Sequence, residues 1–176
     1  AALALFNLGL TKKMINLGVS SFNCLPHRLQ PVASCGKIRF INDSKATNGM
    51  AAARALAAYD DIYWVAGGLA KKDGLTAAIT HLSSVKKAYL IGTAAKSFAK
   101  SLPEYCPAST YKSLEEATRA AFNDANTNPN GGIILLSPAA ASFDQFQNFA
   151  ARGDKFSALA RDLCASKFKP KEENHA

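Results

Sequence analysis

The stretch KIRFINDSKATN, residues 37–48, runs from a short apolar strand pattern through a cluster of polar residues into a helical pattern. Short apolar segments keep alternating with helix-length amphipathic segments to about residue 165. This alternation is typical of a parallel α/β sheet. The later segment GGIILLS (131–137) is apolar almost throughout, as expected for a strand covered on both faces by helices. The sequence therefore predicts an α/β fold with a mostly parallel sheet and helices on both faces.

Strands are predicted over residues 37–42, 61–67, 86–92, 106–111 and 131–137, of which 106–111 has the weakest pattern. Helices are predicted over residues 48–58, 74–83, 94–102, 113–126 and 152–165, with a short one near 142–149. Ahead of the sheet, residues 2–18 repeat apolar side chains at helical spacing and are predicted to form one helix that ends near Gly18. In residues 20–36, two prolines and Gly36 interrupt any regular element, which indicates a hinge or a domain boundary.

Composition places the chain among globular proteins of about one domain. It has 176 residues, 48% of them apolar, which excludes the disordered and fibrous classes. The net charge is +8, but the basic residues are spread along the chain without interleaved aromatic residues, so nucleic-acid binding is not predicted. The apolar opening AALALFNLGL is too short to cross a membrane. The cysteines at 24, 35, 106 and 164 form no metal or disulfide pattern, which fits a reducing cytoplasm.

Polar residues follow three of the predicted strands. Asp43, Lys45 and Thr47 come after the first strand, Lys71 follows a Gly-Gly pair after the second, and Ser142 follows the last. The carboxyl ends of parallel strands form one edge of a sheet, where ligands bind beside helix N-termini. The cations and helix N-termini gathered there predict one anion-binding cleft.

Each of these groups also has a purely structural interpretation. Ser142 with Gln145 matches a capping box, the Gly-Gly pair is a common turn, and Lys71 and Lys72 are compatible with ordinary solvated charges. Residues 43–48 resemble turn and cap chemistry. The functional interpretation rests on all three loops opening on one sheet edge. Neither a G-x-x-x-x-G-K-[ST] phosphate loop nor a Ser/His/Asp set is readable, so a self-contained catalytic centre is not predicted.

Four motifs resemble the C-terminal part of the bacterial Mur ligases over roughly residues 1–165. They are LPHR (25–28), INDSKATN (41–48), a GG pair followed by lysine, and LLSPAAASFDQFQNFAARGDKF (135–156). The resemblance is greatest to the members that add D-glutamate. It implies that residues 1–33 are the last helix of a central ATP-binding domain plus a hinge, that residues 34–166 form a Rossmann-like amino-acid-binding domain, and that residues 167–176 are a disordered tail. The missing initial methionine and phosphate loop agree with a fragment of a longer chain.

By this resemblance, ATP phosphorylates the terminal carboxylate of UDP-N-acetylmuramoyl-L-alanine, and the amine of D-glutamate then attacks the acyl phosphate to form an amide. Mg²⁺ assists and is bound, like ATP, mainly by the absent central domain, so no metal ligand is assigned to this part. The resemblance implies a cytoplasmic, monomeric enzyme of peptidoglycan synthesis with no nucleic-acid or membrane partner. The fragment alone is expected to be inactive.

The resemblance also implies roles for individual residues. Those expected to face the nucleotide once the domains close are Arg28, Asp43 and Lys45. Those expected to form the D-glutamate pocket are Thr47, Lys71, Ser142, Phe143 and Phe149. D-Glutamate carries two carboxylates, so its site needs a full cation and several donors, which the lysine, the two hydroxyls and a helix N-terminus behind Ser142 supply.

Three alternatives stay open. Lys72 competes with Lys71 as the cation of the pocket. The chain also fits a non-catalytic Rossmann-like module that binds a nucleotide or an acidic metabolite. Finally, it fits a sibling Mur ligase that adds another amino acid, although the DxNP-type motifs of the diaminopimelate-adding members are not found.

Overall fold

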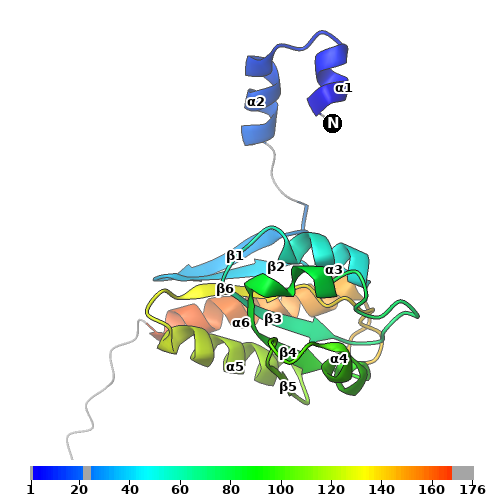
Figure 1. The fold of residues 1–176 in the computed structure, drawn as a ribbon. Coiled ribbons are helices and arrows are strands. Elements are labelled where there is room, and N and C mark those ends of the chain that lie inside the picture. Colours follow the sequence, from blue (N-terminus) through cyan, green and yellow to red (C-terminus); the bar gives the residue numbers. More distant parts are fainter. Residues whose placement is uncertain (1, 22–24, 168–176) are drawn as a thin grey trace, which may run out of the picture.

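The computed structural model describes residues 2–21 and 25–167. Its centre is a six-stranded sheet in the order β1-β2-β6-β3-β4-β5 (Figure 1). β1 pairs antiparallel with β2, and the other pairings in the sheet are parallel, which confirms the mostly parallel sheet. The strands are β1 (Gln30–Cys35), β2 (Ile38–Asn42), β3 (Ile62–Gly67), β4 (Val85–Ile91), β5 (Ala108–Thr110) and β6 (Gly132–Leu136).

Helices cover both faces of the sheet, as predicted. Successive strand residues point to opposite faces. Trp64 therefore packs in the core cluster beneath α3 and α4, whereas Val65 packs in the cluster beneath α5 and α6. The helices on the first face are α3 (Gly49–Leu56), the 3-10 helix η1 (Ile79–Ser84) and α4 (Ala95–Ser101), and those on the second are α5 (Leu114–Thr127) and α6 (Phe149–Lys167).

The register brings three loops to one edge of the sheet. Leu136 at the end of β6 lies opposite Asn42 of β2 on one side and Val65 of β3 on the other. β2 and β6 therefore end level with each other, and β3 continues two residues further, to Gly67. The loops that follow them, residues 43–48, 68–73 and 137–148, begin side by side.

The N-terminal segment differs from its prediction. It forms two helices, α1 (Ala2–Asn7) and α2 (Lys12–Ser21), rather than one that ends near Gly18. Gly9 has a φ of +87°, a left-handed conformation that ends α1, and the Thr11 hydroxyl accepts a hydrogen bond from the Met14 N–H at the start of α2. Residues 168–176, which hold almost all of the predicted tail, and Cys24 lie outside the described residues, whereas Cys35, Cys106 and Cys164 are free and buried.

The sequence does not predict β1, because Pro31 interrupts the pattern of a regular strand. The strand lies at the edge of the sheet, where a proline without an N–H is tolerated. Its register shifts between Pro31 and Ala33, so a bulge accommodates the proline. The hinge segment therefore leads directly into the sheet.

Two predicted helices are also wrong. Residues 74–83 form turns and then η1 instead of an α-helix, and His81 departs from helical geometry with φ −116°. The short helix predicted near residues 142–149 is absent: residues 142–148 form turns and bends, because Ala141 bridges to Leu69 and the loop is held by side-chain bonds, as described below. α6 begins only at Phe149, where the side chain of Asn148 accepts the Ala151 N–H.

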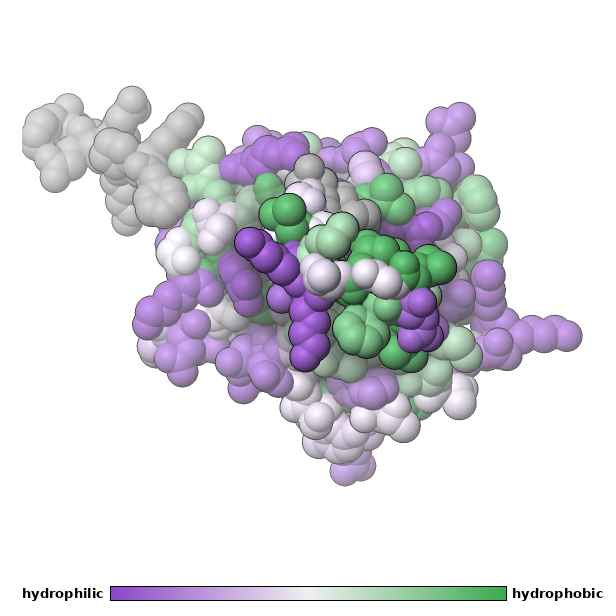
Figure 2. All heavy atoms as spheres, turned by 90° about the horizontal axis from the view of Figure 1, so that it is seen from above, coloured by the Kyte–Doolittle hydropathy of each residue, from purple (hydrophilic) through white to green (hydrophobic). Residues whose placement is uncertain are grey.

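Apolar side chains are exposed on α1 and α2. Figure 2, which views the molecule from above, shows green apolar spheres gathered there. The most exposed are Leu3 (74%), Leu8 (77%) and Leu17 (71%), with Phe6, Met14 and Val19 beside them in the sequence. Among the described helices, none is long and apolar enough to cross a membrane.

Candidate functional site

Asp43 joins three segments at the carboxyl edge of the sheet. Its N–H donates to the Leu136 carbonyl at 2.7 Å, which continues the pairing of β2 with β6. One carboxylate oxygen accepts from the Ser137 hydroxyl at 2.9 Å, and the other accepts from the Leu29 N–H at 3.2 Å. The carboxylate thus ties the hinge segment to the ends of β2 and β6. The neighbouring Asn48 caps α3 by accepting the Ala51 N–H.

The three residues expected at the nucleotide lie together. They line one cavity of about 320 Å³ between the hinge, the β2–α3 loop and α3. The cavity also contains a second arginine that the sequence analysis did not select. Its lining residues are Arg28, Leu29, Asp43, Lys45, Ala46, Ala51, Arg54 and Ala55.

Burial raises the pKa of Asp43 from its ordinary value of 3.8 to about 6, and this effect outweighs the hydrogen bond from Ser137 and the charge of Arg28. The folded protein therefore binds more protons than the unfolded chain between about pH 4 and pH 6. The resulting contribution to stability is fully present below pH 4 and is lost as the pH rises through 6.

Asp43→Asn should remove this pH dependence. The amide can accept from Leu29 and donate to Ser137, but it carries no charge that burial penalises. The free energy of unfolding of the variant minus that of the wild type should therefore increase by about 3 kcal/mol as the pH rises from 4 to 7. Urea unfolding of both proteins at matched pH values measures this difference. A difference that stays constant with pH would show that Asp43 titrates normally.

The turn after β3 depends on two glycines with positive φ. Gly67 (φ +116°) and Gly68 (φ +129°) pass so close to neighbouring backbone that a Cβ would overlap with the carbonyl oxygens of Ile91 and Ala141, respectively. Lys71 follows this turn and lines a second cavity, of about 510 Å³. The other residues of this cavity are Asn48, Gly49, Met50, Asp73, Gly74, Thr76 and Ala77.

The residues expected at D-glutamate are only partly gathered. Thr47 directly precedes Asn48 of the Lys71 cavity and is half-buried. Phe149 lies instead under the nucleotide-side residue Lys45, whose ammonium is 3.9 Å from the ring centroid. Of the two remaining side chains, Ser142 is buried and Phe143 is 70% exposed. Neither of these lines the Lys71 cavity, and Lys72 does not line it either.

The helix N-terminus expected behind Ser142 is absent, since α6 begins at Phe149. The backbone carbonyl of Ser142 accepts from the N–H groups of Gln145 and Phe146 in an isolated turn, and the Gln145 amide donates to the Lys112 carbonyl rather than closing a capping box. Asp144 accepts the Thr93 N–H at 2.9 Å through one oxygen. Its other oxygen is buried without a partner among the described residues. The loop is therefore fixed by long-range contacts.

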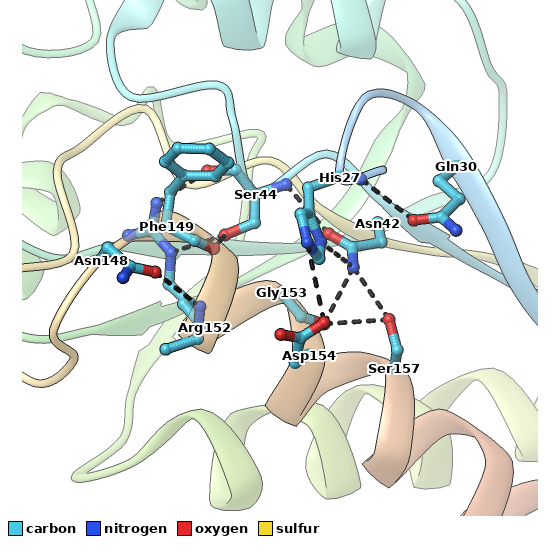
Figure 3. A network of polar contacts seen from close by, with 11 residues as sticks. His27, Gln30, Asn42, Ser44, Asn148, Phe149, Arg152, Gly153, Asp154 and Ser157 are labelled. Atoms are coloured by element: carbon cyan, nitrogen blue, oxygen red, sulfur yellow. Dashed lines mark hydrogen bonds and ion pairs between the residues drawn. The ribbon is translucent and has the colours of Figure 1, made fainter. Parts of the chain in front are cut away.

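Arg152 was missed by the sequence analysis and holds the three loops together. Its side chain leaves α6 and is 1% exposed (Figure 3). It donates to the Ser44 hydroxyl at 3.0 Å and to the Ser44 carbonyl at 2.9 Å in the loop after β2. It also donates to the Ala140 carbonyl after β6 at 3.1 Å and, at 3.5 Å, to the Gly67 carbonyl at the end of β3.

The positive charge of Arg152 is neutralised by no carboxylate within salt-bridge distance among the described residues. Burial lowers the pKa of its guanidinium to about 10, and the charge of Asp144 acts in the opposite direction. Arg152 remains protonated at neutral pH and adds a fixed positive charge beneath the cleft. The helical period could have indicated that Arg152 is buried, because it lies four residues before the buried Phe156 and therefore on the core face of α6.

Comparison with known proteins identifies the family. A model of the family described as "Mur ligase, glutamate ligase domain" matches residues 27–140. The chain belongs to the Mur ligase family. The match covers the hinge residue Arg28 and the loops that hold Asp43 and Lys71. It ends within the loop after β6, just ahead of Ser142.

Two curated Mur ligases illustrate the relationship. The chain is 49% identical over 157 residues to UDP-N-acetylmuramoylalanine--D-glutamate ligase of Rhizobium meliloti, covering 89% of this chain and 34% of that protein. It is 46% identical over 164 residues to the ligase of the same name from Agrobacterium fabrum, covering 93% of this chain and 35% of that protein. The chain thus spans about a third of the length of these relatives.

A solved Mur ligase shares the fold. The structure of UDP-N-acetylmuramate-alanine ligase from Thermotoga maritima matches with a TM-score of 0.59 over 94% of this chain and 36% of that one. The sequence identity is 13%, so this likeness speaks for the fold alone. It agrees with the mostly parallel α/β sheet described above.

Proposed function

We propose that this chain is the amino-acid-binding part of the ligase that adds D-glutamate to UDP-N-acetylmuramoyl-L-alanine in cytoplasmic peptidoglycan synthesis. One observation carries the proposal: two cavities open on the same sheet edge and share the loop after β2. One is lined by Arg28, Asp43 and Lys45, and the other by Asn48 and Lys71. The two substrates, UDP-N-acetylmuramoyl-L-alanine and D-glutamate, are taken from the names of the curated relatives.

The chemistry of the two cavities suits this reaction. ATP would phosphorylate the terminal carboxylate of the UDP-sugar substrate, and the amine of D-glutamate would displace phosphate from the acyl phosphate to form the amide. Arg28 and Lys45 offer positive charge to a nucleotide, and Lys71 offers it to a carboxylate of D-glutamate. The positive charge of Arg152 makes the electrostatic potential at the carboxyl edge of the sheet more favourable for anions. Mg²⁺ would bind mainly to residues outside this chain and would screen phosphate charge during transfer.

The N-terminal helices support the division into domains. We assign residues 1–33 to the end of a central ATP-binding domain and its hinge, and residues 34–166 to the amino-acid-binding domain; the edge strand β1 (Gln30–Cys35) crosses this boundary and joins the hinge to the sheet. The exposed apolar side chains of α1 and α2 are those expected of helices that pack against further parts of the enzyme. Closure at the hinge would bring Arg28 to the nucleotide and keep water away from the acyl phosphate.

The full-length ligase provides the test of the D-glutamate site. Lys71→Met should raise the KM for D-glutamate about 100-fold, because it removes a charge-assisted hydrogen bond to a carboxylate. Lys72→Met serves as the matched control, and we expect its KM to stay within about twofold. Steady-state kinetics with D-glutamate varied gives both values. A rise for Lys72→Met instead would reassign the cation, and no rise for either would remove this cavity from the site.

A further inference from the structure

The His27 side chain is buried in the seam between the hinge and α6. It is 9% exposed, whereas the next residue, Arg28, is exposed. The ring lies against the backbone of Gly153, where a Cβ would overlap with it, and edge-on to Phe149 with centroids 6.0 Å apart (Figure 3). Its Nε2 atom faces Asp154 of α6 at 3.7 Å.

Asn42 fixes which ring nitrogen carries the proton. The Asn42 Oδ1 atom accepts the Ser44 N–H at 3.1 Å, so its Nδ2 atom is the group that faces His27. This amide nitrogen donates to the Gly153 carbonyl and the Ser157 hydroxyl, both at 2.9 Å, and lies 3.1 Å from His27 Nδ1. An amide nitrogen has two hydrogens and no lone pair to offer, so the three surrounding groups share two N–H donors, and a lone pair of His27 Nδ1 rather than a hydrogen faces Asn42. The geometry therefore assigns the ring hydrogen to Nε2, the nitrogen that faces Asp154.

The backbone around the ring connects it to the nucleotide cavity. The His27 carbonyl accepts the Lys45 N–H at 3.1 Å, and Asp43 accepts the Leu29 N–H. His27 (φ +61°) and Leu29 (φ +44°) are both left-handed, a strained conformation that persists only where the surroundings hold it. Arg28 lies between them and lines the cavity. The buried ring anchors this strained segment together with Gln30, whose Oε1 accepts the His27 N–H at 3.0 Å, and Leu29, which packs against the core.

We propose that His27 is a positioning residue of the nucleotide site: its unprotonated Nδ1, held by Asn42, fixes the strained hinge segment and so presents Arg28 to the nucleotide. The inference deepens the proposed function, because it assumes that the Arg28 cavity receives the nucleotide. It makes a specific demand on the side chain at position 27, namely a hydrogen-bond acceptor at the place of Nδ1.

Two substitutions separate this demand from simple space filling. His27→Asn puts a carbonyl oxygen near the position of Nδ1, and asparagine tolerates the left-handed conformation. His27→Gln carries its polar group farther out, near the position of Nε2, and leaves Asn42 without this acceptor. Asp154→Asn is the matched control for the other ring nitrogen, because the Asp154 side chain is 76% exposed.

Nuclear magnetic resonance of the present chain tests the anchor directly. Nitrogen chemical shifts of the imidazole, assigned by the loss of the signal in His27→Asn, should show an unprotonated Nδ1 and a protonated Nε2 at neutral pH. Hydrogen exchange of the Lys45 amide should accelerate about tenfold or more in His27→Gln and stay near the wild-type rate in His27→Asn. A protonated Nδ1 in the wild type would overturn the proposal even if the glutamine variant fails to fold.

Kinetics of the full-length ligase tests the consequence. His27→Gln should raise the KM for ATP about tenfold with kcat nearly unchanged, because ground-state positioning is lost rather than chemistry. His27→Asn should restore the KM to within about threefold, and Asp154→Asn should leave it within about twofold. Equal KM values for the asparagine and glutamine variants would overturn the proposal. Absence of ligase activity in the wild type would contradict the proposed function alone, since the resonance measurement still decides the tautomer.

Discussion

Replacing Arg152 with alanine is expected to lower the free energy of unfolding by about 3–5 kcal/mol. The change would leave the carbonyl oxygens of Ser44 and Ala140 buried without their donor and would open a cavity under three loops. Because the same loops carry Asp43 and Lys71, binding of D-glutamate and nucleotide should weaken together. Urea unfolding of this chain and substrate KM values of the full-length ligase measure the two effects.

The control for this prediction is on the same helix. Arg161 of α6 is exposed, so Arg161→Ala should change the free energy of unfolding by no more than about 0.5 kcal/mol. Arg152→Lys should fall between the two, since one ammonium keeps the charge but reaches fewer of the acceptors. Similar losses for Arg152→Ala and Arg161→Ala would refute the role of Arg152 as the connection between the loops.

Replacing Gly68 with alanine is expected to cost about 3 kcal/mol or more. Its φ of +129° is a conformation that L-residues rarely adopt, and the new Cβ would overlap with the Ala141 carbonyl. Relief of this overlap must move the bridge between Leu69 and Ala141, and with it the start of the loop that holds Ser142. Thermal and urea unfolding should both show the loss.

Gly74 provides the comparison, because it also has a positive φ (+49°) but no atom within 4 Å of the position of a Cβ. Gly74→Ala should cost about 1 kcal/mol, the conformational penalty alone. If both variants lost the same amount, the close backbone approach at Gly68 would have no energetic weight.

Much of the fold could be predicted because it depends on local pattern. The apolar runs around Trp64 and Ile134 gave β3 and β6 within about a residue, and the parallel arrangement followed from the intervening helices. The errors occurred where tertiary contacts override local preference. Pro31 is tolerated because β1 is an edge strand, and residues 142–148 stay non-helical because Ala141 and Asp144 pair with distant backbone groups.

The site was predictable to the extent that its residues are polar and directly follow strands. This rule, with the family motifs, selected Arg28, Asp43 and Lys45, which the structure gathers around one cavity. It could not select Arg152, because that residue reaches the site from within a helix, and it could not anticipate that Phe149 lies against Lys45. Which side chains contact each other across different helices and loops depends on the packed structure, and the spacing of residues in the sequence does not show it.

The connection made by Arg152 limits how this domain can be re-engineered or can diverge. One guanidinium bonds to backbone carbonyls in the loops after β2 and β6 and at the end of β3, where the third loop begins, so a loop grafted from a relative must return its carbonyl to the same point in space. Exchanging a single loop to alter amino-acid preference would disturb the other two. Grafts that move all three loops together with the first turn of α6 would keep their mutual geometry, which makes that set of segments the natural unit of transfer between Mur ligases.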